Sequence, residues 1–408
     1  MFGGAWLYLV FGTLLPAMLL REPTLFLVSL LLFFTGSMSR IWDHYLFTGV
    51  QYTRTLSQHR VFFGEKLTLE VQIANRKLLP LPWFRVEEEV PTAITFTEDT
   101  LPAPGEGRRF LGMGLSLRWY NQITRRYTAV CNRRGAFQMG PARLEAGDLF
   151  GFFRRGITVP AIDRVLVYPR ILPLTSLGIP SRELFGDVRV RRHISEDPAR
   201  VLGTREYVSG DPIKRIHWKS TAHIGRLQTK LLEPVTSVDA ALFLDTRTVE
   251  PPYWGYLDQL LEMGVIAAAS IANYASEHDI RIGLYVNQAS PVADRAIRIP
   301  PASDPAQLAR ILEALAQVYP EEMMPIARLV QLQGHSLAWN TTLVVITAAP
   351  TEALLSTIVR FHRAGRRTAL VLIGEQANAS LGGIPVYRVG ASIPWRKTEG
   401  VSLEAIAL

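Results

Sequence analysis

The sequence predicts a multidomain chain: an N-terminal transmembrane helical hairpin, a β-sandwich, and an α/β doubly wound domain. Three observations lead to this fold class. Residues 1–42 contain two long uncharged stretches, residues 50–170 show strand periodicity, and residues 236–408 alternate strands with helices. At 408 residues the chain is too long for a single core, so several domains are expected.

The two uncharged stretches are Phe2–Leu20 and Thr24–Met38, and Arg21-Glu22-Pro23 separates them. Each approaches the length of about 17–25 residues that crosses a hydrocarbon core. A cleaved signal peptide is the alternative, but it would need a basic segment before the first apolar stretch. We therefore expect residues 1–42 to form a multi-pass membrane anchor.

Basic residues set the expected orientation of this anchor. Arg40, Arg54 and Arg60 follow the second stretch, whereas Arg21 in the turn is balanced by Glu22. The positive-inside rule then predicts that everything after residue 42 is cytoplasmic. A single cysteine, Cys131, excludes an intramolecular disulfide and fits a reducing compartment. The net charge of +8 suits a body near an anionic membrane face, or simply a solvated surface.

The β-sandwich is expected over residues 50–170. Apolar Leu67, Leu69, Val71 and Ile73 alternate with polar residues, as in a strand with one buried face. Further strands are predicted at 83–90, 109–119, 123–130, 136–145 and 164–168. The aromatic-rich Gly147–Phe153 closes the region, either as packing under the sandwich or as a binding surface, and we favour packing.

Residues 180–234 form a predicted linker that carries the segment Arg205–Lys219, here called the signature segment. Gly210 allows a bend, Asp211 is the expected N-cap of a helix from Pro212 to about His223, and Gly225 ends it. On this helix Ile213, Ile216 and Ser220 should face inward. The segment lacks the spacing of a nucleophile–base pair or of a metal site, so we interpret it as a contact surface. The predicted partner-binding residues are Arg205, Tyr207, Gly210, Asp211, Lys214, Arg215, His217, Trp218 and Lys219.

The α/β domain is expected over residues 236–408. Predicted strands lie at 238–244, 281–286, 343–347, 368–373 and 386–389, with helices near 257–275, 305–318 and 351–364. Asp245, Asn287 and Thr347 follow or end strands, so they should meet at the carboxyl edge of the sheet. No glycine-rich phosphate-binding motif follows the first strand, so nucleotide binding is not predicted.

Two motifs resemble a known family. Arg134–Pro141 with Asp148–Gly151, and Arg205–Lys219 followed by Ser220-Thr221-Ala222, are similar to motifs of the bacterial membrane proteins catalogued as domain of unknown function fifty-eight. The resemblance covers nearly the whole chain. It implies a C-terminal domain like that of von Willebrand factor A, and a functional association with a MoxR-type AAA+ ATPase, whose gene often lies beside those of the family.

The resemblance also implies a test for a metal. Domains like von Willebrand factor A often bind a divalent cation through Asp-x-Ser-x-Ser after the first strand. Here Asp245 keeps the first ligand, but Arg247 and Val249 occupy the serine positions. Thr246 and Thr248 carry hydroxyls one place out of register. We expect a degenerate site at Asp245, Thr246 and Thr248, with no metal and no cofactor.

Three functions remain. The preferred one is a non-enzymatic adaptor or scaffold that works with a MoxR-type ATPase in envelope or complex assembly. The second is a membrane-associated enzyme that uses Asp211 and His217. The third, nucleic-acid binding by residues 189–230, is disfavoured because acidic residues interrupt the cations, so no nucleic-acid partner is expected.

Overall fold

The computed structural model describes residues 5–98, 100–102, 107–151, 153–180, 184, 195–209, 211–235, 239–250, 255–289, 296–374 and 381–390. The chain divides into two compact units, Met1–Val167 and Tyr168–Leu408.

The first unit begins with two helices, α1 (Ala5–Leu20) and α2 (Pro23–His44), joined by a turn at Arg21. They contact each other, since the Ser29 hydroxyl donates a hydrogen bond to Thr13 Oγ1 at 2.8 Å. Among the described helices, α2 is the one that is both long and apolar enough to cross a membrane. Helix α1 is apolar but shorter.

The C-terminal end of α2 is fixed to the strands that follow. Trp42 belongs to the core of the strand region, and the Ser39 hydroxyl donates to the Asp148 carboxylate. Lys77 Nζ donates to the backbone carbonyls of Tyr45, at 2.6 Å, and of Leu46. These bonds satisfy carbonyls just beyond the helix, which have no partner within it.

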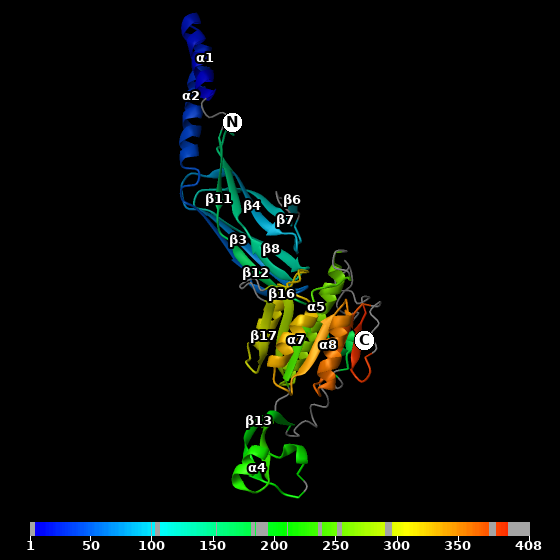
Figure 1. The fold of residues 1–408 in the computed structure, drawn as a ribbon. Coiled ribbons are helices and arrows are strands. Elements are labelled where there is room, and N and C mark those ends of the chain that lie inside the picture. The colour runs from blue at the N-terminus through cyan, green and yellow to red at the C-terminus, as the bar shows by residue number, and fades with distance from the viewer. Residues whose placement is uncertain are drawn as a thin grey trace. The chain divides into compact units, whose positions relative to one another are not determined.

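The strands of the first unit form three sheets (Figure 1). The four-stranded sheet has the order β1 (Val50–Leu56), β3 (Lys66–Asn75), β8 (Gln122–Cys131), β5 (Ile94–Phe96). The five-stranded sheet has the order β11 (Arg154–Val159), β10 (Ala142–Gly147), β4 (Leu81–Pro91), β7 (Arg108–Leu117), β6 (Thr100–Pro102). Both are antiparallel throughout. A third sheet joins β2 (Arg60–Phe62), β12 (Asp163–Tyr168) and β9 (Gly135–Met139).

The two larger sheets share one core. Every second residue of β3 is buried, from Leu67 to Ile73, as the alternation predicts. These side chains lie in the same cluster as Phe84 and Val86 of β4. Two antiparallel sheets with a common core are the arrangement expected of a β-sandwich.

One strand prediction is wrong. Residues 136–145 form two strands, β9 and β10, which belong to different sheets. Gly140 between them has φ +95, and a Cβ there would lie 2.2 Å from the Ala161 carbonyl oxygen. Pro141, which follows, has no N–H to continue a ladder. The chain therefore changes sheet at this point. The short strands β2, β5 and β6 were not predicted, nor were β1, which is half-exposed, and β11, which is almost wholly exposed.

The second unit contains a six-stranded sheet of order β17 (Ala296–Ala302), β16 (Arg281–Ala289), β15 (Asp239–Leu244), β18 (Thr342–Thr347), β19 (Thr368–Ile373), β20 (Val386–Val389). The strands are parallel except for β17, an antiparallel edge strand that was not predicted. Every residue of β15, β18 and β19 is buried, so helices must cover both faces.

Helices pack on the two faces of this sheet (Figure 1). Helices α7 (Ile326–Ser336) and α8 (Glu352–Arg363) share a core cluster with Phe243 of β15. Helix α5 (Asp258–Glu277) lies against the opposite face, where Gly264 approaches Leu244. Phe243 and Leu244 are adjacent, so they point to opposite faces. Helix α6 (Gln307–Ala316) contacts α5. The mixed α/β architecture is confirmed, and α7 is the helix that was not predicted.

Candidate functional site

The signature segment lies at the end of a β-hairpin. Strands β13 (Ser195–Glu206) and β14 (Gln228–Val235) are antiparallel, with Glu206 paired to Gln228. Residues 207–227 are therefore an excursion between two paired strands. They fold back on β14, since the His217 N–H donates to the Gln228 carbonyl at 2.7 Å.

Asp211 holds the base of this excursion together. One carboxylate oxygen accepts from Arg205 Nη2 at 2.6 Å, and the other accepts from the Val208 N–H and the Thr229 hydroxyl. The hydrogen bond from Arg205 holds the pKa of Asp211 below its ordinary value. The carboxylate thus serves as an ionised crosslink between the two ends of the excursion.

The predicted helix from Pro212 to His223 is wrong. The chain forms a 3-10 turn, η2 (Ile213–Arg215), and then a short helix, α4 (Trp218–Ile224). Ile216 lies between them in an extended conformation and makes a β-bridge with Thr229. Because Ile216 pairs with Thr229 in an extended conformation, the chain cannot form one continuous helix through this residue.

The predicted cap is also wrong. Asp211 makes no cap, and His217 is the N-cap of α4, its Nδ1 accepting from the Ser220 N–H at 3.0 Å. The predicted end at Gly225 is confirmed, since this glycine has φ +75 and its N–H donates to the Thr221 carbonyl.

The cations and aromatics of the segment differ in exposure. Lys214, Trp218 and Lys219 are exposed, whereas Tyr207 and Arg215 are half-buried. Gly210 lies outside the described residues. Ile216 is buried as expected, but Ile213 is 72% exposed, so its predicted inward position is wrong.

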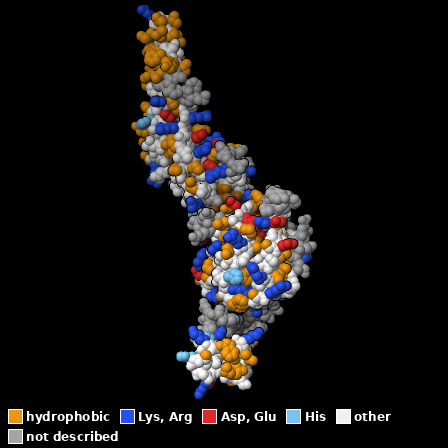
Figure 2. Space-filling model, in the orientation of Figure 1, with side chains coloured by type: hydrophobic (Ala, Val, Ile, Leu, Met, Phe, Trp, Pro, Cys, Tyr) orange, Lys and Arg blue, Asp and Glu red, His pale blue; other side chains and the backbone are white. Residues whose placement is uncertain are grey.

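The excursion and its strands carry a set of exposed apolar side chains, here called the apolar patch. Its members are each at least 44% exposed, and they are Val208, Ile213, Trp218, Ile224, Leu227 and Leu231. Figure 2 shows orange side chains gathered on this part of the molecule, with blue cations beside them. Of this set, Trp218 alone was among the partner-binding residues predicted from the sequence. The spacing of the others does not distinguish an exposed surface from a core: Ile224, Leu227 and Leu231 are three and four residues apart, as on the buried face of a helix.

Asp211 and His217, the pair considered for an enzyme, have separate tasks in the described part of the chain. The carboxylate bonds to Arg205, Val208 and Thr229, and His217 Nδ1 caps α4. A general base would need its orienting group within hydrogen-bond reach, and no such bond joins the two side chains. The geometry gives no support to this pair as a catalytic unit.

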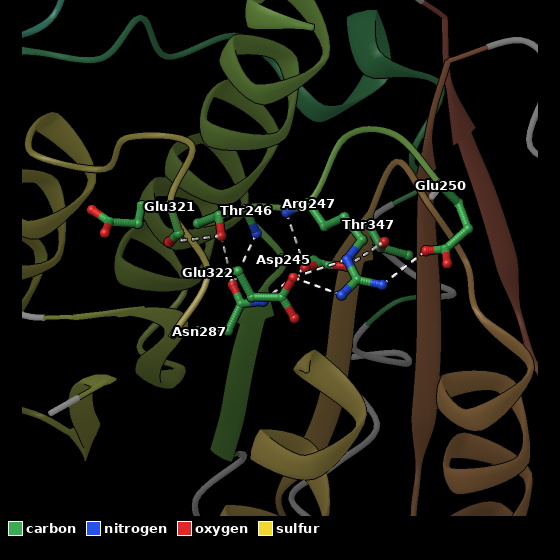
Figure 3. Close-up of polar contacts among 8 residues, drawn as sticks. All are labelled: Asp245, Thr246, Arg247, Glu250, Asn287, Glu321, Glu322 and Thr347. Atoms are coloured by element: carbon green, nitrogen blue, oxygen red, sulfur yellow. Dashed lines mark hydrogen bonds and ion pairs between the residues drawn. The ribbon is translucent and has the colours of Figure 1, made fainter. Parts of the chain in front are cut away.

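A second polar centre lies at the carboxyl edge of the α/β sheet (Figure 3). Asp245, directly after β15, accepts from Asn287 Nδ2 of β16 and from the Thr347 hydroxyl of β18, both at 2.8 Å. The predicted meeting of these three residues is confirmed. The Arg247 N–H also donates to Asp245, at 3.1 Å.

The hydroxyls of the two threonines beside Asp245, Thr246 and Thr248, make hydrogen bonds to neighbouring loops and elements. The Thr246 hydroxyl donates to Asn287 Oδ1 at 3.1 Å and lies 3.3 Å from the Glu321 carbonyl. Thr248 Oγ1 accepts from the Leu257 N–H at 2.8 Å and so fixes the start of α5. Both hydroxyls are buried in these contacts.

Arg247 supplies the positive charge of this centre. Its guanidinium donates to the Glu322 carboxylate at 2.9 and 2.7 Å and to Glu250 at 2.8 Å (Figure 3). Sequence reasoning noticed Arg247 but not Glu322, because the two are distant in the chain. A guanidinium and two carboxylates form a charge-assisted network.

Burial raises the pKa of Asp245 to about 6, although three hydrogen bonds favour its ionised form. A divalent cation needs several free oxygen ligands, but both carboxylate oxygens here already accept hydrogen bonds, and the hydroxyls of Thr246 and Thr248 are engaged elsewhere. These residues do not fit a metal. Among the described residues, no group of three or more His, Cys, Asp or Glu side chains is placed to hold one.

Residues 203–384 match the model of a family described as Protein of unknown function DUF58. This range includes the excursion and most of the α/β sheet. The uncharacterized protein YeaD of Bacillus subtilis (strain 168) is 23% identical over 337 residues, 81% of this chain and 77% of that protein.

Solved structures match with low scores. The CARDB domain of the PF1109 protein from Pyrococcus furiosus is 12% identical with a TM-score of 0.20, over 29% of this chain and 93% of that one. Native alpha-2-macroglobulin from Escherichia coli, from domain MG7 to the C-terminus, is 16% identical with a TM-score of 0.24, over 30% and 24%. The match of residues 203–384 agrees with the resemblance of the signature residues, and this part of the chain is similar to the DUF58 family of proteins of unknown function.

Proposed function

We propose that the protein is a membrane-anchored, non-enzymatic adaptor that uses the apolar patch to bind a protein partner. The partner we propose is a MoxR-type AAA+ ATPase, and the process is envelope or complex assembly. The family resemblance suggests that partner. The apolar patch is the observation that carries the proposal of a binding role.

The patch is unusual for a protein surface. A tryptophan at 66% exposure and an isoleucine at 72% lie in the same short excursion. Contiguous exposed apolar side chains with a polar rim are typical of protein interaction sites. Trp is also enriched among residues whose truncation costs most binding energy.

Charge beside the patch favours an acidic partner surface. Lys214 and Lys219 are exposed within the same excursion, and Asp211 is engaged by Arg205. Cations at the rim of an interface speed encounter with a negatively charged partner. The proposed docking face of the ATPase is therefore apolar with an acidic rim.

The anchor is proposed to be the hairpin of α1 and α2, with both helices in the bilayer and the chain after residue 42 in the cytoplasm. Neither helix carries an acidic or basic residue before Arg40, and the Ser29–Thr13 bond holds them together. A reporter fused after Leu408 tests this orientation. A reporter that is active only in the cytoplasm should be active in this fusion. Strong activity of a reporter that is active only outside the cytoplasm would contradict the proposed orientation.

The α/β domain is proposed to be a von Willebrand factor A-like module that has lost its metal. The Asp245 centre supports this view, because the Arg247 backbone N–H, the Asn287 amide and the Thr347 hydroxyl all donate to the carboxylate that would otherwise be a ligand. In this proposal the module is a rigid platform for the excursion, and the chemistry belongs to the partner.

The test uses paired tryptophans. Trp218→Ala should weaken recovery of the purified MoxR-type ATPase on the immobilised, detergent-solubilised chain. Trp119→Ala is the matched control, because Trp119 is 61% exposed and belongs to the first unit. The two substitutions remove the same side chain at similar exposure, so they should change stability similarly.

A second variant separates charge from apolar contact. Lys214 and Lys219 are both exposed, so Lys214→Ala combined with Lys219→Ala should leave the free energy of unfolding within about 0.5 kcal/mol, as surface changes usually do, and should weaken recovery of the ATPase. If both this variant and Trp218→Ala fold and bind normally, the binding surface lies elsewhere and the proposal fails.

A further inference from the structure

The loop between β10 and β11 is built around a buried carboxylate. Asp148 is 3% exposed, and its oxygens accept from the Phe153 N–H at 2.8 Å and the Phe150 N–H at 3.2 Å. Gly151 turns the chain with φ +77. The two hydrogen bonds fix the positions of Phe150 and Phe153 relative to Asp148.

The same carboxylate accepts from Ser39 of α2, which is fully buried. The loop is thus fastened to the membrane helix at a defined residue. Arg40, next to Ser39, has its guanidinium 5.7 Å from the centre of the Phe153 ring. Two independent contacts therefore fix the loop at the level of Ser39 and Arg40.

That level is the expected edge of the hydrocarbon. Residues 23–39 contain no charged side chain, and Arg40 is the first. At about 1.5 Å per residue, Ser39 lies about 24 Å along α2 from Pro23, compared with roughly 30 Å for a hydrocarbon core. A cation at this position extends to the lipid headgroups.

The loop presents apolar side chains to its surroundings. Leu149 is 57% exposed and Phe150 is 43% exposed. Exposed Arg154 and Arg155 follow, and Arg154 lies 4.9 Å from the centre of the Trp83 ring. Apolar and aromatic groups flanked by cations are typical of segments that lie in the membrane interface.

We propose that this loop is a second membrane contact, in which Leu149 and Phe150 enter the interfacial region of the bilayer that α2 crosses, while Arg40, Arg154 and Arg155 contact anionic headgroups. The inference rests on the proposed membrane anchoring. Its consequence is mechanical: helix and loop together hold the strand domain at a fixed tilt on the membrane, which a single helix would leave free. The packing role expected from the sequence applies to Phe153, which is 7% exposed, and Phe152 lies outside the described residues.

The test uses full-length protein in vesicles of phosphatidylcholine and phosphatidylglycerol in equal amounts. Leu149→Cys is labelled with an environment-sensitive fluorophore, and lipids with a spin label near the headgroup or deep in the acyl chain quench it. Cys131 is fully buried, so label goes to the introduced thiol.

Two matched positions complete the experiment. Ile162→Cys is the control for the loop, because Ile162 is 54% exposed and lies beyond the opposite end of β11. Leu31→Cys, at 58% exposure in the middle of α2, reports the anchor.

We expect the label at 149 to lose emission to the shallow quencher, the label at 31 to the deep quencher, and the label at 162 to neither. Quenching at 31 with none at 149 would overturn the proposed membrane contact of the loop but leave the proposed anchor in place. A loop that binds a protein instead of lipid would give this result. Quenching at neither 31 nor 149 would overturn both. Equal quenching at 149 and 162 would overturn the proposed contact of the loop, because the approach to the membrane would then not be specific to the loop.

Discussion

Arg54 and Glu88 form a buried ion pair that links the two larger sheets of the first unit. Arg54 Nη1 on β1 donates to Glu88 Oε2 on β4 at 2.9 Å, and the two side chains are 1% and 3% exposed. Arg54 also donates to Asp163 at 2.7 Å and to the Ala161 carbonyl at 2.8 Å. Tyr52 donates to Glu88, and burial and the Glu88 charge raise the pKa of Tyr52, so its hydroxyl stays protonated.

Arg54→Ala should therefore destabilise the strand domain by about 3–5 kcal/mol, because it leaves Glu88 buried with its charge uncompensated. Arg126→Ala is the control. Arg126 also pairs with a glutamate on a neighbouring strand, Glu70, but its side chain is 74% exposed, and such pairs contribute about 0–1 kcal/mol. Urea denaturation of the solubilised chain measures both. Equal losses would mean that burial does not govern this pair.

Asp245 should make stability depend on pH. Its folded pKa is about 6 against an ordinary value of 3.8, so the folded state holds a proton that the unfolded state releases between these values. Stability from this group is therefore present below about pH 4 and is lost as pH rises through 6. Two pKa units correspond to roughly 3 kcal/mol.

Asp245→Asn removes this titration. The variant loses a hydrogen-bond acceptor, which adds a constant difference in stability, but its stability relative to the native chain should rise between pH 4 and 6 and level off above. Denaturation at a series of pH values measures the difference. A difference that does not change with pH would contradict the raised pKa.

Divalent cations should not stabilise the chain through the Asp245 centre. A ligand that binds only the folded state must stabilise it, by about 2.7 kcal/mol at one hundred times its Kd. Magnesium or manganese should leave the melting temperature of the α/β domain unchanged. A saturable increase that disappears in Asp245→Asn would show that the carboxylate coordinates a cation after all.

The Cys131 thiol should resist modification. Burial, with the nearby Glu65 charge, raises its pKa to about 12, so the reactive thiolate is scarce at pH 8. A thiol reagent should modify it only after denaturant unfolds the strand domain. Glu65→Gln removes the charge but not the burial, so it should leave the protection in place. Rapid modification of the native chain would mean that the core opens often.

The sequence determined features that depend on local periodicity. Alternation in Leu67–Ile73 indicated a strand with one buried face, the uninterrupted apolar residues of 240–244 indicated a central strand, and the uncharged residues of 23–39 indicated a long apolar helix. Parallel strands end at the same edge, so the meeting of Asp245, Asn287 and Thr347 also followed from their places in the chain.

Tertiary structure decided what depends on contacts between distant residues. Asp211 reads locally as a helix cap, yet Arg205 and Thr229 engage its carboxylate, and the bridge from Ile216 to Thr229 breaks the helix that it would have capped. Arg247 bonds to Glu322, and Ser39 bonds to Asp148. Both pairs are too far apart in the sequence for a local pattern to predict them. The physical reason is that a charged or hydrogen-bonding side chain takes whichever partner the fold brings near it, because leaving it buried and unsatisfied costs more than any local preference supplies.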